Sequence, residues 1–374
     1  MDWIFLAGWT VTAILSWTLR DYGLQALNFP PLNKCLADST STQTDVNATC
    51  LGEVAVLRIS FGNVCFFFLM AVLLLGVTQQ DNLRMMLHTG LWPVKFVVWG
   101  GLIGSTFAMP NNMFHVYGQI ARVLSCFYII FQLVLLLDFI YRINEWLLER
   151  ERCSCVIVGL TGLLIVGSFV GSGFLYKYYA PHASCRLNIF FITWNIVLFL
   201  VYGAISVSPL RVQSAGLLTS AFVFAYTTYY LWSALNSEPV SECVGLSVGG
   251  NKALNITAFV LTLLSVAYTC WSSSVSSQSF DLGTPLSSGS GSSTAEGDGK
   301  IPYRPDFFHL TFLLASAYLV MVFTGWDLAG DDKEFTVDKG WGSTWVKIVA
   351  SWLCAALYLW SMVAHRVLQG RSFY

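Results

Sequence analysis

Residues 112–152 read NMFHVYGQIARVLSCFYIIFQLVLLLDFIYRINEWLLERER, and this stretch decides the fold. It contains no proline and a single glycine, Gly118, while Pro110 precedes it and Asn111 or Asn112 can cap a helix there. About 40 helical residues span roughly 60 Å, about twice the thickness of a hydrocarbon core. The stretch therefore predicts one long tilted helix that divides the segments before it from those after it. The alternative is a transmembrane helix that continues as a surface helix, because length alone does not set tilt.

The composition places the whole chain in a membrane. Apolar residues make up 55% of its 374 residues and charged residues 11%, whereas soluble domains carry about 25% charged residues. The mean hydropathy is +0.62. The net charge of −1 argues against a nucleic-acid partner. We therefore predict an all-α, polytopic membrane protein.

Ten segments have the length and apolarity of membrane-spanning helices. They are residues 3–19, 54–77, 91–109, 116–141, 156–176, 189–207, 215–235, 253–271, 307–326 and 344–367. The seventh is the most polar, with four Ser or Thr residues between 219 and 228 and three tyrosines. The glycine pairs Gly100/Gly104 and Gly167/Gly171 predict close helix contacts.

The loops set the orientation. The polar loop 20–53 holds the glycosylation sequon at Asn47 and two cysteines, Cys35 and Cys50, while Cys185 and Cys243 lie in two later loops that fall on the same side. Disulfides require an oxidising compartment, so we expect a lumenal or extracellular face, with Cys185 paired to Cys243 and Cys35 to Cys50. Unpaired loop thiols are the alternative. An even number of spans then places both termini in the cytosol.

A Ser/Gly-rich run occupies residues 272–304. It cannot bury enough apolar surface to fold, so we expect a disordered cytosolic loop.

Six ionisable residues lie within or beside the predicted spans. A charge inside a membrane is energetically costly, so we expect each of these residues to have a function. These lipid-path candidates are Arg58, Lys95, Arg122, Asp138, Glu145 and Lys347. Asp138 either pairs with Arg142, four residues away on the same helix face, or is available to a lipid amine. The basic residues near span ends either reach toward lipid phosphates or line a polar track through the bilayer.

Enzyme signatures are absent from the sequence. It contains no H-E-x-x-H motif, no phosphate-binding P-loop and no D-x-x-D motif inside a span, and its five histidines lack metal-ligand spacing. His309 opens the ninth span, where we expect it to make an interfacial hydrogen bond. We expect no enzymatic activity, no cofactor and no metal.

Seven motifs carry a resemblance to a known family. They are LRISFG at 57–62, HTGLWPVK at 88–95, QLVLLLDF at 132–139 followed by NEW at 144–146, CRLNIFFITW at 185–194, WSALNSEP at 232–239, FHL at 308–310 and WGSTWVKIVASW at 341–352. In this order and spacing they resemble the serine incorporator (Serinc) family of eukaryotic multipass membrane proteins over nearly the whole chain, and its plant-type members most.

The resemblance implies a single membrane domain of ten helices over residues 1–374, in two bundles joined by a long diagonal helix, with a lipid-accessible groove between the bundles. Residues 1–111 then give the first bundle, 112–152 the diagonal helix, 153–271 the second bundle, 272–304 the loop and 305–374 the last two spans.

The resemblance also implies a lipid-handling function. Family members are described as non-enzymatic phospholipid scramblases, or as carriers or scaffolds that promote serine incorporation into phosphatidylserine and sphingolipids. A serine transporter is a third class, but it predicts matching broken repeats that the sequence lacks. The implied partners are membrane phospholipids, with serine and lipid-synthesis enzymes as further candidates and a homo-oligomer left open. The implied location is the endomembrane system or the plasma membrane.

Overall fold

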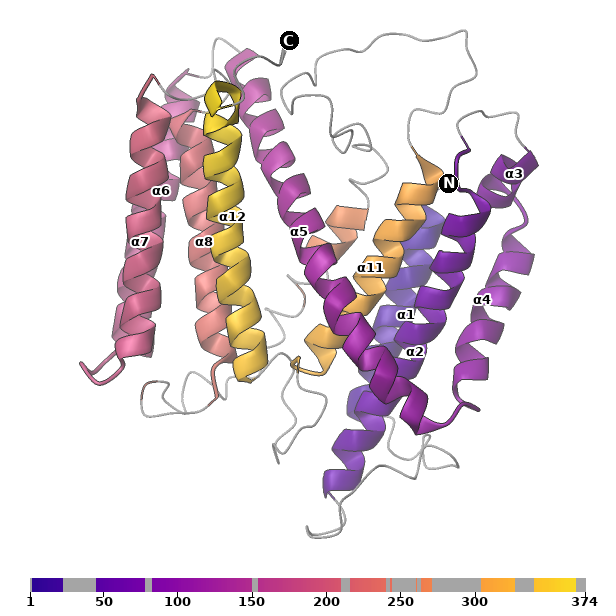
Figure 1. Cartoon of the computed structure of the whole chain (residues 1–374). Helices are drawn as coiled ribbons and strands as arrows, with labels where there is room; N and C mark the ends of the chain where they lie inside the picture. The colour runs from indigo at the N-terminus through magenta and orange to yellow at the C-terminus, as the bar shows by residue number, and fades with distance from the viewer. Residues whose placement is uncertain are drawn as a thin grey trace, which may run out of the picture. The chain divides into compact units, whose positions relative to one another are not determined.

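A computed structural model describes residues 2–22, 45–77, 83–149, 154–209, 216–239, 243, 260, 264–270, 304–326 and 340–367. These residues form helices, and no β-strand occurs among them (Figure 1). The prediction of an all-α fold is confirmed.

Six helices within the described residues are long and apolar enough to cross a membrane. They are α2 (Asp45–Leu73), α5 (Asn111–Glu149), α6 (Ser154–Tyr179), α7 (Arg186–Val207), α11 (Pro305–Phe323) and α12 (Trp341–Val367). Three further helices coincide with the first, third and seventh predicted spans, namely α1 (Asp2–Tyr22), α4 (Trp92–Thr106) and α8 (Leu217–Ser237). The short helix α3 (Leu83–Thr89) precedes α4. The chain is a polytopic membrane protein.

Helix α5 is continuous over 39 residues, from Asn111 to Glu149. At 1.5 Å per residue this is a rise of about 58 Å. The apolar middle of the stretch and its charged end as far as Glu149 therefore belong to one unbroken helix, as predicted, and residues 150–152 lie outside the described residues.

The loop predicted at 20–53 is shorter than expected, because α2 begins at Asp45 rather than at residue 54. The sequon at Asn47 is therefore helical rather than part of a loop. Cys35 and the side chains of Asn47 and Cys50 lie outside the described residues, so glycosylation and the Cys35–Cys50 bridge stay predictions. The loop 272–304 also lies outside them except for Arg304.

The helices form two compact units, and α5 contributes to both, with residues up to Phe131 in the first and residues from Gln132 in the second. The first unit contains α1 to α4 and α11, and the second contains α6, α7, α8 and α12. The last two predicted spans, within residues 305–374, therefore belong to different units.

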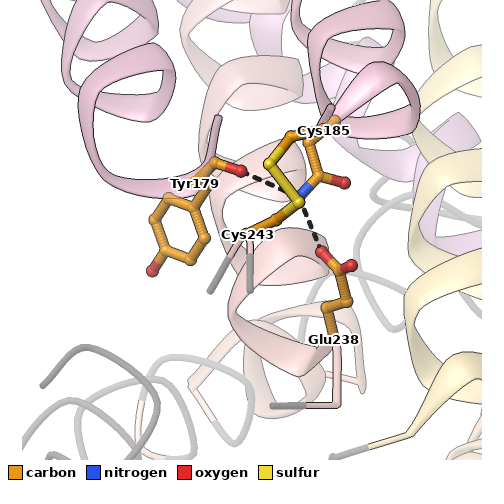
Figure 2. Close-up of a disulfide and its surroundings, with 5 residues drawn as sticks. Tyr179, Cys185, Glu238 and Cys243 are labelled. Atoms are coloured by element: carbon orange, nitrogen blue, oxygen red, sulfur yellow. Dashed lines mark hydrogen bonds between the residues drawn. A yellow bond between two sulfur atoms is a disulfide. The ribbon is translucent and has the colours of Figure 1, made fainter. Parts of the chain in front are cut away.

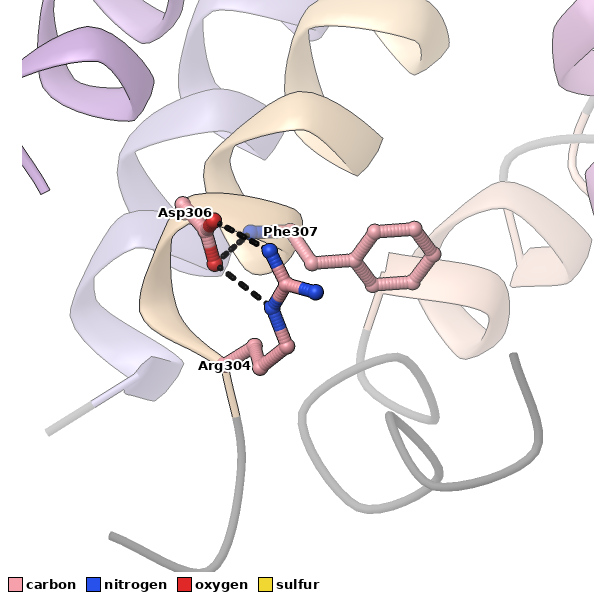
Figure 3. A network of polar contacts seen from close by, with 3 residues as sticks. All are labelled: Arg304, Asp306 and Phe307. Carbon is pink, nitrogen blue, oxygen red and sulfur yellow. Dashed lines mark hydrogen bonds and ion pairs between the residues drawn. The ribbon is translucent and has the colours of Figure 1, made fainter. Parts of the chain in front are cut away.

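The first unit is built around α11, which packs most extensively against α2. Its contacts are largely aromatic, as between Phe67 and Phe312, whose ring centroids lie 5.0 Å apart. Trp9 of α1 donates an indole hydrogen bond of 2.9 Å to Ser316 of α11. Figure 3 shows how α11 begins: Asp306 pairs with Arg304 at 2.8 Å and accepts the backbone N–H of Phe307. A carboxylate in the first turn stabilises the helix N-terminus.

Glycines allow close helix approach at positions other than those predicted. A Cβ on Gly62 of α2 would lie 2.7 Å from the Cα of Ile103 of α4, and one on Gly8 would lie 2.6 Å from the ring of Trp99. Of the predicted pairs, a Cβ on Gly171 would lie 3.5 Å from Thr228 of α8, whereas a Cβ on any of the other three glycines would meet no atom within 4 Å among the described residues.

The second unit is built around α8, which packs against α6, α7 and α12. Phe199 of α7 stacks on Phe224 of α8 with ring centroids 4.1 Å apart. Leu231 and Leu235 of α8 pack with Phe191 and Ile192 of α7. The most polar predicted span is therefore the centre of its unit, where neighbouring helices supply hydrogen-bond partners.

Candidate functional site

A disulfide joins Cys185 and Cys243, with their Cα atoms 5.7 Å apart (Figure 2). It ties the start of α7 to the segment after α8, across 58 residues of sequence. The predicted pairing is confirmed, and the geometry lies within the range that disulfides require.

A buried polar cluster supports this disulfide. Asn188 donates hydrogen bonds from Nδ2 to the carbonyl oxygen of Tyr179 at 2.9 Å and to Oε2 of Glu238 at 2.8 Å. Figure 2 shows Tyr179 and Glu238 beside the two cysteines. Burial raises the pKa of the Glu238 carboxyl above its ordinary value, and the hydrogen bond from Asn188 opposes that rise. One asparagine thus holds the ends of α6 and α8 against the start of α7.

Lys347 of α12 lies at the same end of the second unit. Its Nζ donates to Oγ of Ser237 at 2.6 Å and to the carbonyl oxygen of Ser233 at 3.3 Å. The half-buried lysine therefore satisfies acceptors in the last turn of α8, where a positive charge is favourable.

The acidic candidates lie at the other end of α8. Asp138 and Arg142 of α5 form an ion pair of 2.9 Å, with the Asp138 side chain 9% exposed and that of Arg142 45% exposed. Glu145, half-buried, lies two helical turns beyond Asp138. A Cβ added to Gly216, which precedes α8, would lie 3.7 Å from Oδ1 of Asn144, so this segment of α5 is close to the start of α8. Because α8 has 21 residues, about 31 Å separate this end from that of Lys347. We call Asp138, Arg142 and Glu145 the α5 charged cluster.

A row of buried hydroxyl residues runs along α8 between these two ends. Tyr358 of α12 shares its hydroxyl with Thr219 at 2.7 Å and Ser220 at 2.9 Å, and Asn195 of α7 donates to Thr228 at 3.2 Å. The sequence indicated the hydroxyl residues but not their partners. A lone asparagine inside the apolar span 189–207 was the available signal for Asn195.

Arg58 is fully buried in the first unit. Its guanidinium donates to the carbonyl oxygens of Thr106 and Met109, the latter at 2.8 Å, and to Oδ1 of Asn111 at 2.6 Å. It also lies 4.4 Å from the ring centroid of Phe114. Arg58 thus fixes the connection between α4 and α5 to α2.

The other two basic candidates also bind protein groups. Lys95 is 7% exposed and donates to the carbonyl oxygen of His88 at 2.8 Å, with Nζ 3.9 Å from the ring centroid of Trp92. Arg122 donates to the carbonyl oxygen of Trp326 at 3.1 Å, just after α11.

The six candidates are therefore not gathered within either unit. Arg58, Lys95 and Arg122 belong to the first unit, and Asp138, Glu145 and Lys347 to the second. The α5 charged cluster combines opposite charges with an exposed arginine, Arg142, on a helix of mean hydropathy 2.4 over its most apolar window. It is the strongest candidate for contact with a lipid headgroup.

Comparison with known proteins agrees with this membrane architecture. The family model described as "Serine incorporator (Serinc)" matches residues 3–296 and 287–371. The chain belongs to the Serinc family. This Serinc protein is 29% identical to a probable serine incorporator of Nematostella vectensis over 371 residues, covering 86% of the present chain and 81% of that relative. It is 30% identical to serine incorporator 3 of Bos taurus over 378 residues, covering 85% and 80% of the two chains.

Proposed function

We propose that this Serinc protein is a non-enzymatic phospholipid scramblase, in which the α5 charged cluster contacts the headgroup. The observation that carries the proposal is the exposed Arg142 beside the buried acid Asp138 and the half-buried acid Glu145 on an otherwise apolar helix. A phospholipid with an amine carries both a phosphate and an ammonium group. Arg142 can donate to the phosphate, and either carboxylate can accept from the amine.

The physical basis of the proposal is the cost of moving a polar headgroup through hydrocarbon. An unpaired charge is strongly disfavoured there, and a paired site on the protein lowers that barrier. A path of this kind requires neither a nucleotide nor covalent chemistry, which fits the absence of enzyme motifs in the sequence.

A second candidate function is that of a carrier or scaffold for serine incorporation into phosphatidylserine and sphingolipids. The names of the relatives favour it. The partners would then be serine and lipid-synthesis enzymes. A serine transporter has less support, because the long helix α5 is unbroken.

In each case we place the protein in the endomembrane system or the plasma membrane with both termini cytosolic. The Cys185–Cys243 disulfide supports this, because it requires an oxidising side.

The test uses purified protein in liposomes with a fluorescent phospholipid and a membrane-impermeant quencher. Wild-type protein should expose the inner-leaflet label without ATP. Asp138→Leu should alter the rate, but it also leaves Arg142 without its acid. The double change Asp138→Leu/Arg142→Leu removes both charges and restores stability. Glu149→Leu is the matched control, since Glu149 is an exposed acid on the same helix.

The outcomes distinguish the roles of the pair. Abnormal flipping in the stable double variant, with Glu149→Leu normal, would place the cluster on the lipid path. Restored flipping in the double variant would make the pair structural. Wild-type protein that flips no lipid under any condition would refute the scramblase proposal and favour the carrier or scaffold.

A further inference from the structure

Two histidines that are 221 residues apart in the sequence meet in the core of the first unit. Nδ1 of His88, in α3, lies 3.1 Å from Nε2 of His309, in α11, and both side chains are buried. Nδ1 of His309 has no hydrogen-bond partner among the described residues. The predicted interfacial hydrogen bond of His309 is thus a buried bond to a second imidazole.

The pair is enclosed by aromatic rings. Phe5 of α1 lies 4.8 Å from His309 and 5.6 Å from His88 between ring centroids, and Phe67 of α2 lies 6.0 Å from His309. Phe308 packs against both histidines. The pair therefore lies in an apolar surrounding.

The charged groups around the pair come from three helices. From α4, the ammonium group of Lys95 is bonded to the backbone carbonyl of His88. From α11, Asp306 lies three residues before His309, and its carboxylate is paired with Arg304 (Figure 3). From α3, Arg84 lies one turn before His88 and is exposed. The elements α1 and α2 present Phe5 and Phe67. The ammonium group bonded to His88 therefore brings a positive charge to the pair, and the carboxylate of Asp306 is paired with Arg304.

The hydrogen bond between the rings depends on the number of protons they hold. Two neutral imidazoles share one N–H between Nδ1 of His88 and Nε2 of His309. A single added proton keeps that bond but introduces a cation beside Lys95. A second added proton leaves two donors facing each other at 3.1 Å, so the bond is lost.

We propose that the His88–His309 pair is a proton-sensitive lock that holds α3 on α11 and releases it when the pair takes up protons. The two rings are hydrogen-bonded at a pH above the range in which histidines ordinarily titrate. The bond weakens as the pH falls through that range. Loss of the contact would free the connection between α2 and α4, because α3 forms part of that connection. Nothing in this proposal depends on lipid movement.

The expected size of the effect follows from proton linkage. A histidine that is protonated only when released, with an ordinary pKa of about 6.5, favours release roughly tenfold between pH 7.5 and pH 5.5. If both histidines behave in this way, the effect is roughly a hundredfold.

The test is hydrogen exchange of the full-length protein in nanodiscs between pH 7.5 and pH 5.5, corrected for the pH dependence of intrinsic exchange. We expect residues 83–89 to lose protection by tenfold or more, while α8 keeps its protection. The double variant His88→Phe/His309→Phe should remove this pH dependence. The matched control is His115→Gln/His182→Gln, because both of these histidines are exposed, and it should behave as the wild type.

Unchanged protection of residues 83–89 in the wild type across this range would overturn the proposal. The same loss of protection in a folded His88→Phe/His309→Phe variant would also overturn it. If that variant does not fold, the pH dependence of hydrogen exchange in the wild-type protein tests the proposal. Loss confined to α3 and the start of α11 supports the lock, and equal loss in every helix refutes it.

Discussion

Substitution of Arg58 distinguishes a structural role of this residue from a role on the lipid path. The change Arg58→Met removes three hydrogen bonds, to Thr106, Met109 and Asn111, and a contact with the ring of Phe114. Methionine keeps an unbranched apolar stem but provides no donor. The carbonyl oxygens of Thr106, at the end of α4, and of Met109, in the connection to α5, are then left without the donor that binds them in the wild type.

The magnitude follows from these contacts. Polar contacts inside membrane proteins average about 0.6 kcal/mol, so three of them contribute roughly 2 kcal/mol. A desolvated cation–π contact contributes up to about 2 kcal/mol more. We therefore expect the free energy of unfolding to fall by about 2 to 4 kcal/mol, with Arg58→Lys intermediate because an ammonium group lacks the guanidinium fork.

The assay is reversible unfolding in mixed micelles, together with lipid flipping per folded molecule in liposomes. Arg84→Met is the matched control, because Arg84 is exposed, and its unfolding should change by less than about 0.5 kcal/mol. Flipping per folded Arg58→Met molecule should equal that of the wild type. A fully stable Arg58→Met variant with impaired flipping would refute this reasoning and return Arg58 to the lipid path.

Three further predictions concern the disulfide end of the second unit and the sequon. Cys185→Ser/Cys243→Ser should lower the free energy of unfolding by about 2 to 4 kcal/mol, and a reducing agent should then have no further effect on thermal unfolding. Glu238→Gln should raise stability at pH 7 but not near pH 4. Burial raises the pKa of this carboxyl, so its stabilising contribution is complete below the unfolded value of 4.5 and is lost as the pH rises through the folded value. A thermal melt that shows the same pH profile for both proteins would contradict this. Glycosidase should shift the mobility of wild-type protein from the secretory pathway but not that of Asn47→Gln, and a cytosolic tag accessible at this segment would reverse the orientation.

Much of the fold follows from apolar length alone. The membrane class, the unbroken helix α5 and nearly all of the span positions were predictable, because a segment in lipid must satisfy its backbone within its own helix. The start of α2 was not predictable, because polar residues such as those at 45–53 suit either a loop or a helix that extends beyond the bilayer. The contacts of the glycines were also not predictable, since spacing does not show which face of a helix meets a neighbour.

The candidate site was predicted in its residue types but not in its grouping. The Asp138–Arg142 pair follows from helical periodicity, which places residues four apart on one face. Lys347, in contrast, binds the end of α8 because α12 and α8 pack together, and no local rule connects residues 347 and 237. The six lipid-path candidates belong to two units, three in each.

The sequence by itself determined that this protein lies in a membrane, that it is helical and that it belongs to its family. It also indicated the Cys185–Cys243 pairing. These properties depend on local composition, on motif order and on which loops share a membrane face. The tertiary structure decided that α11 is the centre of the first unit, that Arg58 binds the carbonyl groups of Thr106 and Met109, and that His88 meets His309. The physical reason is that contacts between distant helices depend on which helix faces pack together. In lipid every face of a helix can be apolar, so small residues and polar partners, rather than the hydrophobic pattern, determine which faces meet.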